Sequence, residues 1–134
     1  MADYLPAIRW LHLLAASVWT GGLIVLGALV VALRRAGVER EVLRAAARQF
    51  GRVSWAAMAI ALVTGVAQVE ASGYAWSYGR LHLKLGLVAL AIVVALAHQL
   101  TARRTSPALR GALEGLVLLI SLGIFAAAVG LRAP

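Results

Sequence analysis

The chain contains no cysteine and only two methionines, Met1 and Met58. Without cysteine it can form no disulfide, no thiolate metal site and no covalent haem linkage through a Cys-x-x-Cys-His motif. Two methionines provide little material for thioether coordination of a soft metal. Paired catalytic carboxylates, a Ser/His/Asp set and a phosphate-binding loop are also missing, which leaves redox, proton or metal chemistry.

Charged residues are scarce as well. They make up 13% of the 134 residues, whereas 63% are apolar and the mean hydropathy is +0.90. A small soluble domain exposes too much of its surface to bury that many apolar side chains. The lipid bilayer must therefore be the solvent for most of the side chains. At 134 residues the chain is expected to form one domain.

Four apolar stretches are expected to cross the membrane, at about 7–33, 53–70, 80–101 and 109–131. The first contains 23 residues without a charge, Leu11 to Leu33, which is enough for a hydrocarbon core of about 30 Å. It is too long for a cleaved signal, so we expect it in the mature protein. Pro6 suits the first turn of a helix. The expected fold is an all-α, four-helix transmembrane bundle forming one domain over 1–134.

The basic residues predict the orientation of these spans. Nine of the thirteen lie in the linkers after the first and third spans: Arg34, Arg35, Arg40, Arg44, Arg48, Arg52, Arg103, Arg104 and Arg110. The positive-inside rule places both linkers in the cytoplasm and both termini outside. The protein is thus expected to be a multi-pass protein of the cell inner or plasma membrane. Trp10, Tyr74, Trp76 and Tyr78 are expected to form an aromatic belt at the outer interface.

Three sequence features bear on partners. No basic stripe interleaves with aromatics, so nucleic acid is not an expected partner despite a net charge of +8. Residues 38–52 fit either an amphipathic helix on the inner leaflet or a solvated basic linker. Gly111 and Gly115 have GxxxG spacing, which favours close helix packing, either within the chain or in a homodimer.

Ionisable residues inside membrane spans are costly and indicate function. His12 and His82 lie near the outer ends of the first and third spans, which run in the same direction, so both belong to one leaflet. Small residues lie one turn further along the same faces, Ala16 after His12 and Gly86 after His82, with Trp19 two turns beyond His12. Such slots suit a flat macrocycle held by two imidazoles, as in a b-type haem.

Cations at the same depth would pair with the haem propionates, namely Arg9, Arg80 and Lys84. Lys84 is two residues from His82, about 200° around a helix, so the two side chains point to opposite sides. The structural alternative is that His12 and His82 each satisfy a backbone carbonyl or an interfacial water. The chain leaves both interpretations open.

His98 and Glu114 lie near the inner ends of the third and fourth spans. They are expected to meet as a hydrogen-bonded pair. A structural pair is one interpretation, and a proton relay or second metal site is the other.

The segment from His12 to Leu23, His-Leu-Leu-Ala-Ala-Ser-Val-Trp-Thr-Gly-Gly-Leu, resembles the opening helix of the copper-resistance protein D (CopD) domain. The similarity continues over Phe50-Gly51-Arg52-Val53-Ser54, Val63-Thr64-Gly65 and Tyr78-Gly79-Arg80-Leu81. It ends with Lys84-Leu85, Leu109-Arg110 and Glu114. This resemblance implies four helices and copper handling.

The chain is also similar to a related family, the HemJ-type haem b proteins. That family has a histidine followed by tryptophan and glycine, as in His12, Trp19 and Gly22, and Leu-His-x-Lys, as in residues 81–84. The chain departs from it at Val25-Leu26-Gly27, where the family has Pro-Arg. The resemblance implies a haem b between the first and third helices.

Three functions remain open at this stage. The leading one is a b-type cytochrome that transfers electrons between its haem and an outer-face redox partner or quinone. The alternative is copper transport or handling, with His12, His82 and Glu114 along an ion path. The third is a scaffold subunit without a cofactor.

The orientation generates the first prediction. A reporter that is active only outside the cytoplasm should be active when it is fused after Pro134, because nine basic residues fall in the two linkers expected to be cytoplasmic. Paired alkaline phosphatase and green fluorescent protein fusions measure this directly. Activity of the cytoplasmic reporter alone would show that the orientation is reversed.

Overall fold

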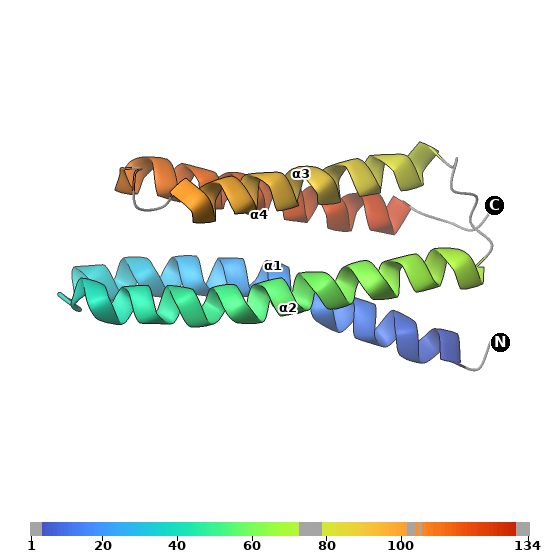
Figure 1. Ribbon diagram of the computed structural model, residues 1–134, viewed down its shortest axis with the longest axis horizontal. Coiled ribbons are helices and arrows are strands. Elements are labelled where there is room, and N and C mark those ends of the chain that lie inside the picture. The colour runs from blue at the N-terminus through green and yellow to red at the C-terminus, as the bar shows by residue number, and fades with distance from the viewer. Residues whose placement is uncertain (1–3, 73–78, 102–103, 105, 131–134) are drawn as a thin grey trace. The chain divides into compact units, whose positions relative to one another are not determined.

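The computed structural model describes residues 4–72, 79–101, 104 and 106–130, and its regular structure there is helical. The four long helices are α1 (Leu5–Arg35), α2 (Arg40–Ser72), α3 (Gly79–Thr101) and α4 (Pro107–Gly130) (Figure 1). Each is long and apolar enough to cross a membrane. The chain is therefore an all-α membrane protein with four candidate spans, as the sequence predicted.

Most of the apolar surface of these helices is not buried by other parts of the protein. In the most apolar 18-residue window of each helix, between 11% and 22% of the residues are buried. Water would penalise such exposure heavily, whereas lipid tails are as apolar as the side chains themselves. The hydrocarbon of the membrane is the environment that this surface requires.

The observed helices differ from the expected spans mainly in α2. It begins at Arg40, whereas the span was expected to begin near residue 53. Most of the segment 38–52 is thus neither a separate surface helix nor an irregular linker, because it forms the first turns of α2. A helix of 33 residues is about 50 Å long, roughly 20 Å more than the hydrocarbon core.

The turn between α1 and α2 is closed by a Schellman motif. Gly37 has a φ of 79°, a left-handed conformation that glycine adopts without steric cost. The N–H of Val38 donates to the Leu33 carbonyl at 3.1 Å, and the N–H of Gly37 donates to the Arg34 carbonyl at 3.1 Å. These bonds satisfy carbonyls that a helix end would otherwise expose. Pro6 lies in the first turn of α1, as predicted.

The helices α1 and α2 pack against each other as an antiparallel hairpin. The buried and half-buried positions of α1 recur at spacings of three and four, as in coiled-coil packing. They include Leu5, Ile8, His12, Ala15, Trp19, Gly22, Leu26, Val30 and Leu33. Trp19 meets Trp55 of α2 edge to face, with ring centroids 5.5 Å apart and an interplanar angle of 68°.

The helices α3 and α4 form a second hairpin. Its seam has the same periodicity. On α3 it contains Leu81, Lys84, Val88, Ala91, Ala95 and His98, and on α4 Arg110, Leu113, Val117, Ile120, Ile124 and Ala127. A Cβ placed on Gly123 would lie 3.7 Å from Leu87, but none at Gly111 or Gly115 would have a neighbour within 4 Å. The GxxxG pair therefore does not pack α4 onto α3, and its role in a homodimer stays a prediction.

Gly22 generates a prediction about the first hairpin. A Cβ at Gly22 would lie 2.5 Å from Cε2 of Phe50, whereas one at Gly27 would meet nothing within 4 Å. Both changes to alanine remove a helix-destabilising glycine, worth about 1 kcal/mol. Only Gly22→Ala adds an overpacking cost, typically about 1–3 kcal/mol. Gly22→Ala should thus be less stable than Gly27→Ala in SDS unfolding followed by circular dichroism. Equal stability of the two variants would contradict the observed packing.

Candidate functional site

His12 lies in the seam of the first hairpin, and its imidazole is hydrogen-bonded to α2. Nδ1 lies 2.9 Å from the carbonyl oxygen of Ala61 and 3.0 Å from Oγ1 of Thr64. The Thr64 hydroxyl itself donates to the carbonyl oxygen of Ile60 at 2.6 Å. The hydroxyl proton is thus directed back to the α2 backbone, and the Thr64 oxygen faces His12 as an acceptor.

These contacts determine the tautomer of a neutral His12. A carbonyl oxygen can only accept, so Nδ1 must carry the proton that it shares with Ala61 and Thr64. Nε2 of the same ring then holds the lone pair, which is the form of imidazole that coordinates a metal. Ligand histidines commonly donate their other ring N–H to a backbone carbonyl, which fixes the ring and raises its basicity.

Gly65 permits this close approach of the imidazole to α2. A Cβ at position 65 would lie 3.3 Å from Cε1 of His12 and 3.7 Å from Nδ1. Thr64 is buried, and His12 is half-buried. Ala61, Thr64 and Gly65 thus form a cradle that holds one edge of the ring, which we call the His12 cradle.

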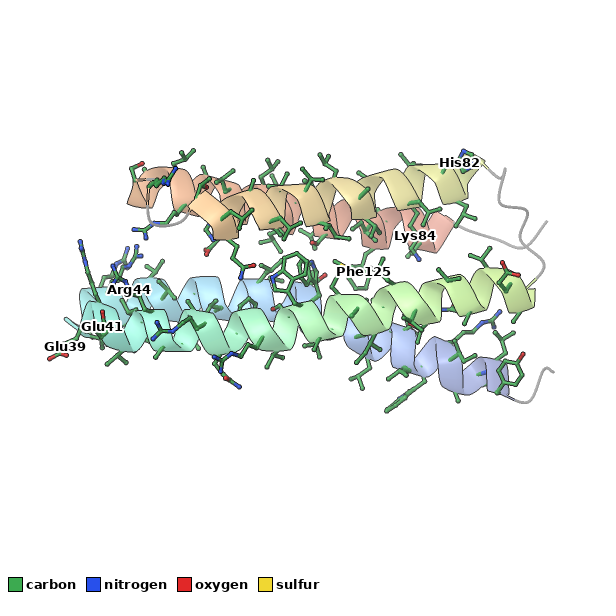
Figure 2. All side chains as sticks on the ribbon, in the orientation of Figure 1. Glu39, Glu41, Arg44, His82, Lys84 and Phe125 are labelled. Atoms are coloured by element: carbon green, nitrogen blue, oxygen red, sulfur yellow. The ribbon has the colours of Figure 1, made fainter. Side chains whose placement is uncertain are left out.

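The second predicted ligand, His82, lies on a different side of its helix from Lys84. His82 is exposed, whereas Lys84 is half-buried in the seam with α4. The two side chains leave α3 in opposite directions (Figure 2). His82 makes no hydrogen bond or ion pair with any other residue that the structure describes. The predicted divergence of these side chains is confirmed, and His82 lies on the side of α3 that α4 leaves open.

The other residues predicted to surround a haem have varied environments. Ala16 is half-buried, Trp19 is buried against Trp55, and Arg9 is exposed. Gly86 is exposed, and a Cβ there would have no neighbour within 4 Å. The Arg80 side chain lies outside what the structure describes.

Trp10, one of the four residues of the predicted aromatic belt, is 65% exposed. Tyr74, Trp76 and Tyr78 lie outside the described residues.

His98 and Glu114 form the predicted pair within the second hairpin. Nε2 of His98 lies 3.2 Å from Oε1 of Glu114. Nδ1 of His98 is buried and has no hydrogen-bond partner within the described part of the chain. Glu114 is 47% exposed at its side chain. The pair links α3 to α4, and its predicted role in a proton relay or second metal site stays a prediction.

Sequence reasoning did not identify the His12 cradle. Val63-Thr64-Gly65 contributed to a family resemblance, but no role for these residues followed from it. The position of Gly37 could have located this cradle. Gly37 lies midway between Trp19 and Trp55 in the sequence, so residues equally far before and after Gly37 lie opposite each other in the hairpin. The residue as far after Gly37 as His12 is before it lies between Ala61 and Thr64.

No preformed cluster of three or more His, Cys, Asp or Glu side chains able to hold a metal ion occurs among the described residues. In comparisons with known proteins, no family model, curated protein or solved structure matches this chain.

The His98–Glu114 contact generates a prediction about stability. His98→Ala and Glu114→Ala should be non-additive, with a coupling of about 0.6 kcal/mol, the average for hydrogen bonds between membrane helices. SDS unfolding of both single variants and the double variant measures this. Leu96→Ala combined with Glu114→Ala is the control and should be additive, because Leu96 makes no polar contact. Additive effects for His98 and Glu114 would show that the contact contributes nothing.

Proposed function

We propose that this four-span membrane protein binds haem b non-covalently, that His12 and His82 would hold the haem iron, and that the protein transfers electrons. The electrons would pass between the haem and a redox partner or quinone. The orientation of the His12 ring is the observation that carries the proposal. The Ala61 carbonyl lies 2.9 Å from Nδ1 and accepts its proton, so a neutral His12 carries its lone pair on Nε2, and histidine ligands commonly have this arrangement.

The donor chemistry of the chain fits this group. With no cysteine, neutral imidazole is the available nitrogen donor of the kind that ligates iron in b-type haems. The haem, when bound, would supply reversible one-electron chemistry. His12 would be held by its cradle, which restricts rotation of the ring and keeps its proton on Nδ1. Arg9, Arg80 and Lys84 would pair with the propionates.

The open side of α3 supports His82 over Lys84 as the second ligand. Lys84 lies in the seam that α4 already occupies, and a ligand in that seam would have to displace packed side chains. His82 occupies no such seam. Leu81-His82-Leu83-Lys84 is also the sequence that resembles the HemJ-type haem proteins, a relation that we retain as part of this proposal.

Copper handling by a CopD-like protein is the alternative function. It would need His12, His82 and Glu114 along one path, but Glu114 contacts His98 within the second hairpin. The contacts of the described residues favour no second function over haem binding.

The proposal predicts a coloured protein. Protein purified in detergent from cells with sufficient haem should show a Soret band and, when reduced, an α band of low-spin haem b. The pyridine haemochrome assay gives the stoichiometry. Colourless protein that retains copper stoichiometrically would overturn the proposal in favour of copper handling.

The ligand assignment predicts how variants change that spectrum. His12→Ala should abolish or strongly weaken haem binding, and His82→Ala should leave a high-spin or labile haem. Gly65→Val keeps both ligands but fills the space beside Cε1 of His12, so it should also weaken binding. His98→Ala is the control and should leave the spectrum nearly unchanged, since His98 lies 16 residues from His82, about 24 Å along α3. If Lys84→Met loses the low-spin spectrum while His82→Ala keeps it, Lys84 is the ligand instead.

A further inference from the structure

The uncharged stretches of α1 and α2 do not lie at the same level of the first hairpin. The α1 stretch runs from Leu11 to Leu33, and the α2 stretch runs from Val53 to Val69. Trp19 meets Trp55 with ring centroids 5.5 Å apart, so the α2 stretch begins opposite the middle part of the α1 stretch. The two stretches therefore overlap over roughly ten residues, or about 15 Å, which is half of a hydrocarbon core of about 30 Å.

Arginines of α2 lie opposite the middle of the α1 stretch. Gly22 is the central residue of that stretch, and a Cβ at Gly22 would lie 2.5 Å from Cε2 of Phe50. Arg48 and Arg52 are two residues before and two residues after Phe50. Each of them is therefore only about 3 Å from this central level, measured along the axis of α2.

These two residues are the deep end of a longer series. Arg40, Arg44, Arg48 and Arg52 recur every fourth residue and are all exposed, and we call them the arginine ladder. Arg44 and Arg40 lie about 9 Å and 15 Å from the central level, toward the turn. Glu41 pairs with Arg44, with Oε1 and Nη1 3.3 Å apart (Figure 2). The other three make no ion pair or hydrogen bond with any described residue, and depth is what separates Arg48 and Arg52 from Arg40.

The deep arginines and the exposed apolar residues of α1 point to opposite sides of the hairpin. Arg48 and Arg52 are each two residues from Phe50, about 200° around the helix, so they point away from α1. Ile24 is likewise two residues from Gly22, so it points away from α2, and it is 51% exposed. At its central level the hairpin is thus apolar on one side and cationic on the other.

No depth in the bilayer suits this hairpin if lipid surrounds all of it. With the α1 stretch in hydrocarbon, unpaired arginines would contact lipid near the membrane centre, where they are highly unfavourable. With the α2 stretch there instead, the second half of α1 would expose Ile24, Val25 and Leu29 to water. Both penalties disappear if α1 meets lipid while the arginine side of α2 meets water at the same depth. Ionisable residues within membranes typically face water-filled cavities.

We propose that Arg48 and Arg52 lie within the membrane and line a water-filled crevice that attracts small anions. The crevice enters from the side of the α1–α2 turn and follows the arginine ladder inward. Beyond Arg52 the same side of α2 has Ala56, Ala59 and Val63, which offer no polar group, so the crevice ends there. This site depends neither on haem binding nor on which side of the membrane the turn occupies.

Thiol accessibility tests the proposal in the full chain, which has no cysteine of its own. Gln49→Cys keeps both arginines and places a thiol beside them, since Gln49 is exposed and lies between Arg48 and Arg52. Ile24→Cys places a thiol at the same depth on the apolar side. Each variant is reconstituted in phosphatidylcholine vesicles. Anionic sulfonatoethyl methanethiosulfonate, or its cationic trimethylammonium analogue, is admitted to both sides by freezing and thawing. The unreacted thiol is then measured by its gel shift with maleimide polyethylene glycol.

The two positions should differ in rate and in charge preference. Gln49→Cys should react at least about a hundredfold faster than Ile24→Cys, because a charged reagent enters hydrocarbon only at a large penalty. It should also prefer the anionic reagent by about tenfold, relative to free β-mercaptoethanol, because two guanidinium charges lie close to the thiol.

Two pairs of substitutions with equal loss of charge separate a local effect from a net-charge effect. When added to Gln49→Cys, Arg48→Gln with Arg52→Gln should remove the preference for the anionic reagent. Arg34→Gln with Arg35→Gln, at the end of α1, should retain most of it. Circular dichroism checks that all variants keep their helices.

The remaining outcomes would overturn the proposal. An unreactive thiol in Gln49→Cys would show that lipid or protein covers the arginines. Equally fast reaction of Ile24→Cys would show that this half of the hairpin lies outside the membrane. No preference of Gln49→Cys for the anionic reagent, or equal loss of the preference in both pairs, would show that Arg48 and Arg52 do not set the charge of the crevice.

Discussion

Hydrocarbon offers no hydrogen-bond partner, and this one property of the solvent constrains the whole chain. Backbone groups within the membrane must bond to one another, which is why the spans are long helices. Apolar side chains can remain exposed, since lipid is as apolar as they are, and most of them do. Polar side chains have the opposite requirement, because they must find partners inside the protein or reach the headgroups. The position of each polar residue in this chain is thus informative.

The seams of the two hairpins are where several of these polar groups are satisfied. The Thr64 hydroxyl donates a hydrogen bond to the Ile60 carbonyl, the Ser121 hydroxyl donates to the Val117 carbonyl at 2.7 Å, and His98 contacts Glu114. His12 belongs to the same group, because it shares its Nδ1 proton with α2. The structural alternative proposed for His12, a bond to a backbone carbonyl, is therefore realised at one nitrogen. It is compatible with ligation through Nε2, since a metal and a carbonyl need different edges of the ring.

The arginine-rich start of α2 shows the same constraint on the backbone. Because α2 continues as one helix from Arg40 through Arg52, its backbone groups stay hydrogen-bonded to one another. A separate helix lying flat on the membrane surface would have needed a break near Arg52, and α2 has none.

The sequence by itself determined the solvent, the fold class and most of the helices, because uninterrupted apolar length is a local property that needs no partner. It also predicted that His98 would meet Glu114, since an antiparallel hairpin brings the inner ends of adjacent spans together. It did not determine where α2 begins, because the residues from Arg40 to Arg52 are too polar to register as a span and yet remain helical. Nor did it determine the His12 cradle, because Ala61 bonds to the imidazole through its backbone carbonyl oxygen. Every residue has this group, so the residue type gives no indication of the contact. Only the packing of α1 on α2 decided which carbonyl receives the imidazole proton, through the register set by Gly37 and the space left at Gly65.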